Sequence, residues 1–320
     1  MAKWTANDVP SQAGRLAVVT GTGGIGYETA LVLAQHGAEV ILAGRTERKG
    51  RDAIRKILAL APEARVRFEL LDLADLSSVT AFSNQLLAQD RPVDLLVNNA
   101  GVMTPPSRRT TVDGFELQFG TNYLGHFVLT AQLLPALQSA IAPRVVEVSS
   151  GAHRLGGAIH FEDLQWARSY KPLAAYAQSK LAMLMFALEL QRRSDAAGWG
   201  LMSNAAHPGF ARTELIANGP GADALMWKIH KVLVRPFLSH SAADGALPVL
   251  FAATSAEANN GGYYGPTGRF ELIGAPGPAV IGARAKDLAV AKQLWEISED
   301  LTGARLQVGL ALHNSARKGA

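Results

Sequence analysis

Residues 16–26 read LAVVTGTGGIG and join an apolar run to a cluster of glycines. The run Leu16–Thr20 has the length and composition of a buried strand, and the residues after it, IGYETALVLAQHG, read as a helix that ends near Gly37. Glycines at such a strand-to-helix turn let backbone N–H groups approach an anion at the positive end of the helix. The stretch therefore predicts the phosphate-binding turn of a dinucleotide fold, with an ordinary tight turn as the alternative.

Further strand-like and helical segments alternate along the chain. The apolar, strand-like runs are residues 39–43, 66–73, 93–99, 144–150 and 201–206. Segments in which apolar residues recur every three or four positions are predicted as helices, at 46–61, 76–89, 174–197 and 284–301. Runs this apolar are typical of strands that are covered on both faces. The alternation predicts the α/β class, with a single Rossmann-like, doubly wound parallel sheet and helices on both faces.

The chain contains no linker rich in Pro, Gly or Ser, so we expect one domain over residues 1–320. Within it, residues 1–13 are expected to form an N-terminal extension and residues from about 262 to 320 a C-terminal segment. Residues from about 210 to 240 are expected to form a helical elaboration on the substrate side. Apolar residues at helical spacing there suit either a core helix or a lid over a lipophilic substrate. They are Leu225, Met226, Ile229, Leu233 and Phe237.

Composition argues against several classes of function. Of 320 residues, 48% are hydrophobic and 18% charged, which is typical of a globular protein. The net charge is +4, but Lys and Arg are interleaved with Asp and Glu, which favours a small anionic ligand over nucleic acid. There is no Cys, and the eight His show no metal-ligand spacing, so no metal site is predicted. Without an apolar signal region or a run of about 18 apolar residues, we expect a cytoplasmic protein with no stable membrane insertion.

The end of the second predicted strand bears on the choice of nucleotide. Dinucleotide folds usually place Asp or Glu there, about 20 residues after the glycines, to bind the ribose 2′-hydroxyl. This chain reads LAGR instead, with Gly44 in place of the acid and Arg45 after it. The arrangement favours a 2′-phosphate and hence NADP(H), although the same charge would also suit a solvated helix start, and NAD(H) remains an alternative.

Tyr176 and Lys180 lie four positions apart in the predicted helix 174–197, so their side chains share one face. None of the other five tyrosines has Lys at the fourth position. A tyrosine with a pKa of about 10 is a poor base at neutral pH. An ammonium about 4 Å away contributes about 4 kcal/mol at an effective dielectric constant of about 20, enough to lower that pKa by up to roughly three units. The pair is therefore expected to serve in proton transfer.

With the remaining motifs, these residues resemble the short-chain dehydrogenase/reductase family over nearly the whole chain. The motifs, in the family's order, are the glycine loop, LLDL with Asp72, NNAG at 98–101, Asn122, Ser150, Tyr176 with Lys180, and HPG at 207–209 with Thr213. The family's loop, T-G-x-x-x-G-x-G, is one residue longer, so the resemblance assigns the closing glycine positions to Gly24 and Gly26. The stretches SSGAH and GGYYGPTG look most like the retinol dehydrogenase and protochlorophyllide reductase branch.

The resemblance implies a role for each motif residue. It implies that Tyr176 protonates a carbonyl oxygen as hydride arrives from nicotinamide, while Ser150 hydrogen-bonds to the same oxygen. It further implies that Lys180 binds the nicotinamide ribose and that Asn122 completes a proton relay through water. The cofactor-binding residues that it implies are Gly21, Thr22, Gly24, Ile25, Gly26, Arg45, Asp72, Leu73, Asn99, Ala100, Gly101, Tyr176, Lys180, Pro208, Gly209 and Thr213. From the residues alone, Asp72 could instead cap the turn at residues 75–77, and Thr213 could instead be the N-cap of the following helix.

The expected activity is the NADP(H)-dependent interconversion of a carbonyl and an alcohol on a lipophilic small molecule. Alternatives are the same reaction with NAD(H), C=C reduction or epimerisation in the same pocket, and a non-catalytic nucleotide sensor. The presence of Tyr176 and Lys180 argues against the sensor. The resemblance also suggests a homodimer through the helices of Asn122 and Tyr176, unless the long segment between Ser150 and Tyr176 covers that face.

Overall fold

The computed structural model describes residues 3–155, 158–212 and 239–306, which contain one eight-stranded sheet. The strand order is β3-β2-β1-β4-β5-β6-β7-β8; all neighbouring pairs are parallel except β7 with β8. The strands are β1 (Leu16–Thr20), β2 (Glu39–Gly44), β3 (Arg65–Leu70), β4 (Leu95–Asn98), β5 (Arg144–Val148), β6 (Met202–Ala206), β7 (Tyr263–Pro266) and β8 (Pro276–Pro278). The predicted doubly wound, Rossmann-like sheet is confirmed.

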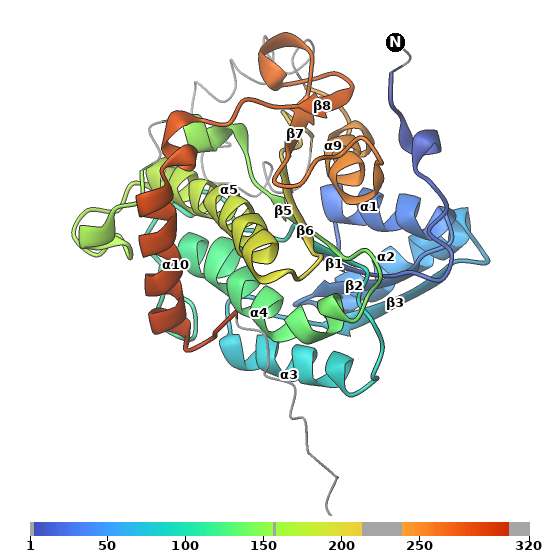
Figure 1. The fold of residues 1–320 in the computed structure, drawn as a ribbon, viewed down its shortest axis with the longest axis horizontal. Coiled ribbons are helices and arrows are strands. Elements are labelled where there is room, and N and C mark those ends of the chain that lie inside the picture. Colours follow the sequence, from blue (N-terminus) through green and yellow to red (C-terminus); the bar gives the residue numbers. More distant parts are fainter. Residues whose placement is uncertain (1–2, 156–157, 213–238, 307–320) are drawn as a thin grey trace, which may run out of the picture.

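Helices cover both faces of the sheet (Figure 1). The α-helices of the described residues are α1 (Gly24–Gln35), α2 (Glu47–Leu60), α3 (Leu76–Leu87), α4 (Gly125–Gln138), α5 (Pro172–Ala197), α9 (Ala242–Thr254) and α10 (Leu288–Thr302). One face is buried by α1, α2 and α9, through residues such as Leu33, Ile57 and Val249. The other is buried by α3, α4, α5 and α10, through residues such as Phe127 and Trp295. Both faces are therefore apolar, as the uninterrupted strand patterns predicted.

Several elements differ from the prediction. The helix α9 and the strands β7 and β8 were not predicted; β7 reads YYGP and β8 reads PGP, a composition typical of turns that a short strand at the edge of a sheet tolerates. The predicted strand 66–73 is β3, which ends at Leu70. Because β3 is the other edge strand and none of its residues is fully buried, the expectation that every strand is covered on both faces is wrong here.

The C-terminal helix is shorter than predicted, and the expected lid lies outside the described residues. The helix predicted at 284–301 is split into a 3₁₀ turn, Ala283–Lys286, and α10, because the Asp287 carboxylate accepts the backbone N–H groups of Ala289 and Val290 and caps α10. The apolar stripe expected between residues 225 and 237 and the predicted cofactor residue Thr213 lie outside the described residues.

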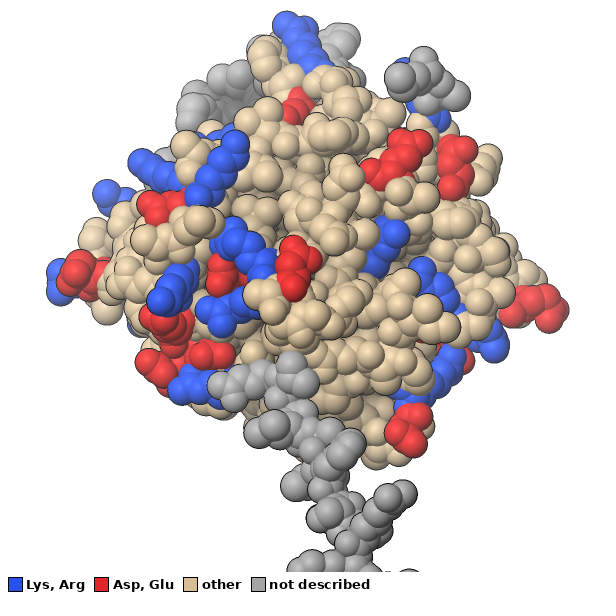
Figure 2. Space-filling view, viewed as in Figure 1, with Lys and Arg blue, Asp and Glu red and all other residues tan. Residues whose placement is uncertain are grey.

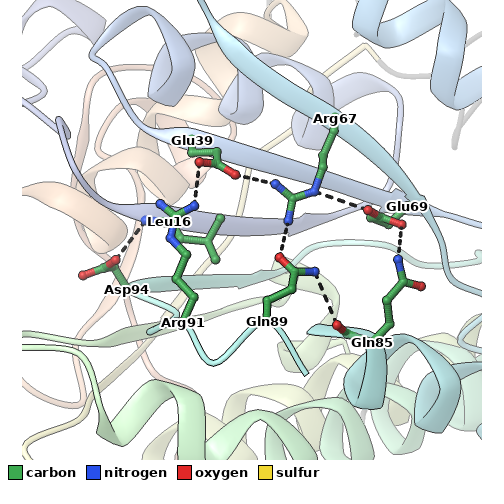
Figure 3. A network of polar contacts seen from close by, with 8 residues as sticks. All are labelled: Leu16, Glu39, Arg67, Glu69, Gln85, Gln89, Arg91 and Asp94. Carbon is green, nitrogen blue, oxygen red and sulfur yellow. Dashed lines mark hydrogen bonds and ion pairs between the residues drawn. The ribbon is translucent and has the colours of Figure 1, made fainter. Parts of the chain in front are cut away.

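A polar network joins the amino ends of β1 and β2 to β3 and the α3–β4 loop (Figure 3). The Glu39 carboxylate on β2 forms ion pairs with Arg67 on β3 and with Arg91 in the loop, the latter at 2.6 Å. The Asp94 carboxylate accepts the backbone N–H of Leu16 at 2.8 Å. Since Glu39 is mostly buried and bonded on both oxygens, it connects three segments that are distant in sequence.

Replacing Glu39 tests this network. Burial by itself would raise the pKa of Glu39, but the hydrogen bonds and charges of Arg91 and Arg67 hold it below its usual value. A carboxyl with a lowered folded pKa adds stability above its unfolded pKa, and this stability is lost as pH falls through the folded pKa. We expect Glu39→Gln to lower the free energy of unfolding by about 1 to 2 kcal/mol at neutral pH, after allowance for the partly exposed arginines, and by less in acid.

Urea unfolding at neutral and acidic pH measures this change. Asp52→Asn is the matched control, because Asp52 pairs with the exposed side chains of Arg48 and Arg55 on α2. It should change the free energy of unfolding by less than about 0.5 kcal/mol. Equal losses in the two variants would contradict a stabilising role for the Glu39 network.

The surface charges are mixed, as the sequence predicted, and the longest helix is part of the apolar core. On the face shown in Figure 2, Lys and Arg are interspersed with Asp and Glu. Among the described residues, only α5 is long and apolar enough to cross a membrane, and 78% of its most apolar window is buried inside the fold. We therefore treat α5 as the core helix that carries Tyr176 and Lys180.

Candidate active site

The carboxyl ends of β1, β4, β5 and β6 meet at one edge of the sheet, where the strand order reverses between β1 and β4. A cavity of about 970 Å³ lies at this edge. Predicted site residues that line it are Ile25, Asn99, Gly101, Ser150, Tyr176, Lys180, Pro208 and Gly209. The fold thus gathers motifs from the glycine loop to HPG around one cavity.

Three glycines of the loop between β1 and α1 are required by its geometry. Gly21 and Gly24 have φ angles of +96° and +52°, in the left-handed region that favours glycine. A Cβ at Gly26 would lie 2.3 Å from the carbonyl oxygen of Gly21, whereas a Cβ at Gly23 would meet no atom within 4 Å. The constrained positions are therefore 21, 24 and 26, as the family loop implies, and the apparent G-x-G-x-x-G through Gly23 is incidental.

The loop fits a dinucleotide. The helix α1 begins at Gly24, and no side chain caps its first N–H groups, which can therefore bind a phosphate. A Cβ at Gly44 would lie 2.8 Å from the methyl group of Thr22, so an acid at position 44 would collide with this side chain. Arg45 is exposed and forms no ion pair within the described residues, whereas its neighbour Arg48 pairs with Asp52 at 3.7 Å. The Arg45 guanidinium is therefore not engaged in an ion pair among the described residues and is accessible to an anionic ligand.

The NNAG turn is held against the end of β1. The backbone N–H groups of Asn99 and Ala100 both donate to the Thr20 hydroxyl oxygen at 2.9 Å. The Asn99 side chain also donates to the Thr20 carbonyl oxygen at 2.7 Å. A Cβ at Gly101 would lie 2.9 Å from the Asn122 side-chain oxygen, so glycine allows this turn to pass close to the π-helical turn Phe119–Leu124. The turn is therefore packed between the glycine loop and Asn122.

The other residues predicted to contact the nucleotide make contacts within the protein. The Asp72 carboxylate accepts the N–H of Ala74 at 2.9 Å. The expected alternative, that Asp72 caps the turn at residues 75–77, is wrong, because the Asp75 carboxylate accepts the N–H groups of Ser77 and Ser78 there. Leu73, next to Asp72, is buried. Gly209 has a φ of +63°, and its close approach to Leu272 leaves no room for a Cβ. The Pro208 carbonyl accepts from His240 Nε2 at 2.6 Å, which fixes this side of the cavity.

Ser150 and Tyr176 both line the cavity. Tyr176 lies on α5 with 7% of its surface exposed, and Ser150 follows β5. Burial raises the pKa of Tyr176 to about 12, opposed in part by a hydrogen bond with the Ser150 hydroxyl. The ammonium of Lys180 lies 5.9 Å from the Tyr176 ring centre and donates to the Val148 carbonyl at 2.8 Å. The expectation that Lys180 brings the pKa of Tyr176 near neutral is therefore wrong here, because burial dominates and the ammonium bonds to β5.

Asn122 links the backbone of Val102 to the helix α5. It is fully buried in a π-helical turn, Phe119–Leu124. Its side-chain oxygen accepts from the Val102 N–H at 2.7 Å, and its amide nitrogen donates to the Val102 carbonyl at 3.0 Å and to the Ser179 hydroxyl at 2.9 Å. Both polar atoms of the side chain are thus engaged with protein groups. The proton relay through water remains a prediction.

Comparison with known proteins shows the family of this chain. A family model described as short chain dehydrogenase matches residues 15–220, more than half of the chain. The chain belongs to that family. Mouse retinol dehydrogenase 13 is 42% identical over 321 residues, covering 97% of this chain and 90% of its own length. Mouse polyprenol dehydrogenase is 40% identical over 303 residues, covering 92% and 86%.

A solved structure has a similar fold and sequence. The crystal structure of an uncharacterised protein from Mycobacterium paratuberculosis superposes with a TM-score of 0.79 at 42% identity, covering 96% of this chain and all of the other. Membership of the short-chain dehydrogenase family makes this protein an oxidoreductase with an NAD(P)-binding Rossmann fold.

Two buried titratable residues of this dehydrogenase were not predicted. Glu147 on β5 is fully buried, and burial raises its pKa to about 8, opposed by a hydrogen bond from Asn98 and by the charge of Lys180. His126 on α4 is fully buried and bonds to the Asn122 carbonyl. Both lie inside quoted motifs, VVEVSS and TNYLGHF, and the spacing of four between Asn122 and His126 was the available signal.

Proposed function

We propose that this dehydrogenase uses NADPH to reduce a carbonyl group on a lipophilic small molecule to an alcohol. The observation that carries the proposal is the pairing of the Ser150 and Tyr176 hydroxyls inside a mostly apolar cavity, beside the glycine loop. The free Arg45 and the side-chain-free Gly44 support NADPH over NADH.

The chain's own residues suit the reductive direction. Bound NADPH would supply the hydride. Ser150 would hydrogen-bond to the carbonyl oxygen, and Tyr176, whose raised pKa keeps it a neutral phenol, would donate its proton to that oxygen. The ammonium of Lys180 stabilises the phenolate that this transfer leaves behind. The glycine loop and Arg45 would hold the nucleotide phosphates.

The walls of the cavity favour an apolar substrate. They include Val102, Leu155, Leu173, Phe210 and Leu272. Leu155 and Leu173 are 65% and 56% exposed although they are large and apolar. An apolar ligand would cover such side chains and gain the free energy of burying their surface. The names of the two mouse relatives, retinol and polyprenol dehydrogenase, support the same class.

A substrate comparison tests the proposal. Purified protein is assayed with NADPH and retinal, a polyprenyl aldehyde or, as the hydrophilic comparison, glyceraldehyde. We expect kcat/KM for the lipophilic aldehydes to exceed that for glyceraldehyde by at least about tenfold, with the alcohol as product. Chromatography that finds a saturated carbonyl, or product without net NADPH consumption, would replace carbonyl reduction by C=C reduction or epimerisation.

Reduction is expected to decline with rising pH as Lys180 loses its proton. Burial lowers the pKa of Lys180 to about 8, and the charge of Glu147 partly opposes this. The cation is therefore present below pH 8 and lost above it, whereas Tyr176 keeps its proton to higher pH. The pH profile of reductive kcat/KM at saturating NADPH measures this decline. In Lys180→Met, kcat/KM should be lower and should not decline near pH 8. A wild-type kcat/KM that stays constant well above pH 8 would contradict the role of the Lys180 cation.

We propose that the protein does not dimerise through α4 and α5, because α10 covers that face (Figure 1). The Tyr123 hydroxyl bonds to the Ser298 hydroxyl of α10 at 2.7 Å. The buried Trp295 of α10 packs against Phe127 of α4 and Phe186 of α5, with ring centres 5.4 and 5.6 Å apart. We expect sedimentation at working concentration to give a monomer mass. A dimer that persists on dilution would require another interface or displacement of α10.

A further inference from the structure

A chain of buried hydrogen bonds leads from the NNAG turn to the catalytic helix α5. It starts at the Asn99 and Ala100 N–H groups, which donate to the Thr20 hydroxyl oxygen at 2.9 Å. The Thr20 hydroxyl bonds to His126 Nε2 at 2.9 Å, and His126 Nδ1 bonds to the Asn122 carbonyl at 2.7 Å. The path thus crosses from β1 and β4 to α4 through a single imidazole.

The second half of the chain reaches the backbone of Tyr176. The Asn122 amide nitrogen donates to the Ser179 hydroxyl at 2.9 Å, and this hydroxyl donates to the Tyr176 carbonyl at 2.8 Å. Thr20, His126, Asn122 and Ser179 are all fully buried. Water therefore has no access to their polar atoms, and each partner lost would leave a buried group unsatisfied.

The geometry sets the direction of these bonds. A carbonyl only accepts, so Nδ1 of His126 must carry a hydrogen. Burial, and to a smaller extent the charge of Lys180, lower the pKa of His126 to about 3, so the ring is neutral and Nε2 is an acceptor. The Thr20 hydroxyl therefore donates to Nε2; its other acceptor, the Val97 carbonyl, is farther away at 3.3 Å. The bonds from Asn99 through Thr20 and His126 therefore run in one direction to the Asn122 backbone carbonyl, and neighbouring bonds in this series can strengthen one another. The bonds from the Asn122 side-chain amide through Ser179 to Tyr176 form a second series, which is joined to the first through the covalent frame of Asn122.

We infer that His126 is a positioning residue of this dehydrogenase, which holds the catalytic helix in register with the nucleotide-binding turns. His126 is not among the residues that line the cavity, so it acts through Asn122 and Ser179 rather than on substrate. It also gives the Asn122 carbonyl a side-chain partner next to the π-helical turn Phe119–Leu124. The kinetic part of this inference rests on the proposed carbonyl reduction.

Two variants distinguish the bond that Nδ1 makes to Asn122 from the bond that Nε2 makes to Thr20. In His126→Asn, the amide nitrogen can take the place of Nδ1 and donate to Asn122, but the side chain is too short to reach Thr20. His126→Phe keeps the ring volume and makes neither bond. We expect the Phe variant to lose about tenfold in kcat with the Kd for NADPH changed less than about twofold, and the Asn variant to recover part of that loss.

A control on the same helix distinguishes positioning from general stability. Thr130 on α4 accepts a buried hydrogen bond from the Asn98 side chain at 3.0 Å and takes no part in the chain. Thr130→Val should lower Tm and leave kcat unchanged. Unchanged kcat in a folded His126→Phe protein, or a kcat loss in Thr130→Val as large as that in His126→Phe, would overturn the positioning role.

The tautomer of His126 can be read in the wild-type protein, without any assay. Nitrogen NMR of ¹⁵N-histidine-labelled protein should show a neutral ring protonated at Nδ1. Protonation at Nε2, or a charged ring at neutral pH, would reverse or break the chain and overturn the inference. If the wild-type protein reduced no carbonyl but showed the Nδ1 tautomer, the proposed function would fail while the hydrogen-bond chain stood.

Discussion

Tyr176→Phe should lower kcat for carbonyl reduction by about 10²- to 10⁴-fold, the usual contribution of a general acid. Tyr176 is a buried, neutral phenol bonded to Ser150, and phenylalanine keeps its ring but has no proton to donate. The Lys180 ammonium bonds to the Val148 carbonyl and does not depend on the phenol. Affinity for NADPH should therefore change by less than about twofold, a difference of under about 0.4 kcal/mol.

Steady-state kinetics and a fluorescence titration with NADPH measure the two quantities separately. Tyr264→Phe is the control: its hydroxyl is hydrogen-bonded to the Asn259 N–H at 2.6 Å, but the residue packs on the α1 and α9 face of the sheet. This variant should lose stability and keep kcat. A Tyr176→Phe enzyme with undiminished kcat would remove the proposed mechanism.

Arg45→Ala should remove a preference for NADPH over NADH of roughly 10- to 100-fold. A charge-assisted hydrogen bond contributes about 1.5 to 3 kcal/mol, and Arg45 is the cation next to the position where Gly44 leaves no carboxylate. The loss should appear in the Kd of NADPH alone, because NADH has no 2′-phosphate for the guanidinium to bind. Fluorescence titrations at one salt concentration give the Kd of NADPH and the Kd of NADH for the wild-type protein and for the variant.

The matched control for Arg45 is Arg55→Ala, which removes an exposed cation near the middle of α2 that already pairs with Asp52. It changes the net charge equally but should leave the ratio of the two Kd values unaltered. Equal binding of NADPH and NADH by the wild-type protein would assign the enzyme to the NAD(H) alternative. Failure to bind either would show that the one-residue-shorter loop no longer holds a dinucleotide.

Elements with a regular apolar period could be predicted well from the sequence. The strand β1 was predicted with its observed boundaries, and α2 lies within one residue of its prediction at each end. The period is visible because these elements bury one stripe or both faces. The strands β7 and β8 escaped prediction because their Gly and Pro residues are typical of turns, and they form strands only by pairing at the sheet edge.

The site, too, was predicted only in part from the sequence. Several motif residues line one cavity, because parallel strands present their carboxyl ends, and the loops that follow, at the same edge, whereas the predicted residues Arg45, Asp72 and Asn122 do not line it. The pKa of Tyr176 was predicted in the wrong direction. Spacing along a helix shows that Tyr176 and Lys180 share a face, but it shows neither how deeply the phenol is buried nor that the ammonium bonds to Val148.

The sequence by itself determined the α/β class, the glycine positions of the loop and the identity of the Ser, Tyr and Lys groups. These follow from local periodicity, from backbone conformations that only glycine adopts readily, and from side-chain chemistry. Only the tertiary structure decided the ionisation of Tyr176 and Lys180, the covering of α4 and α5 by α10, and the link from Thr20 through His126 to Asn122. Each of these depends on burial and on contacts between residues far apart in the chain, which no local pattern records.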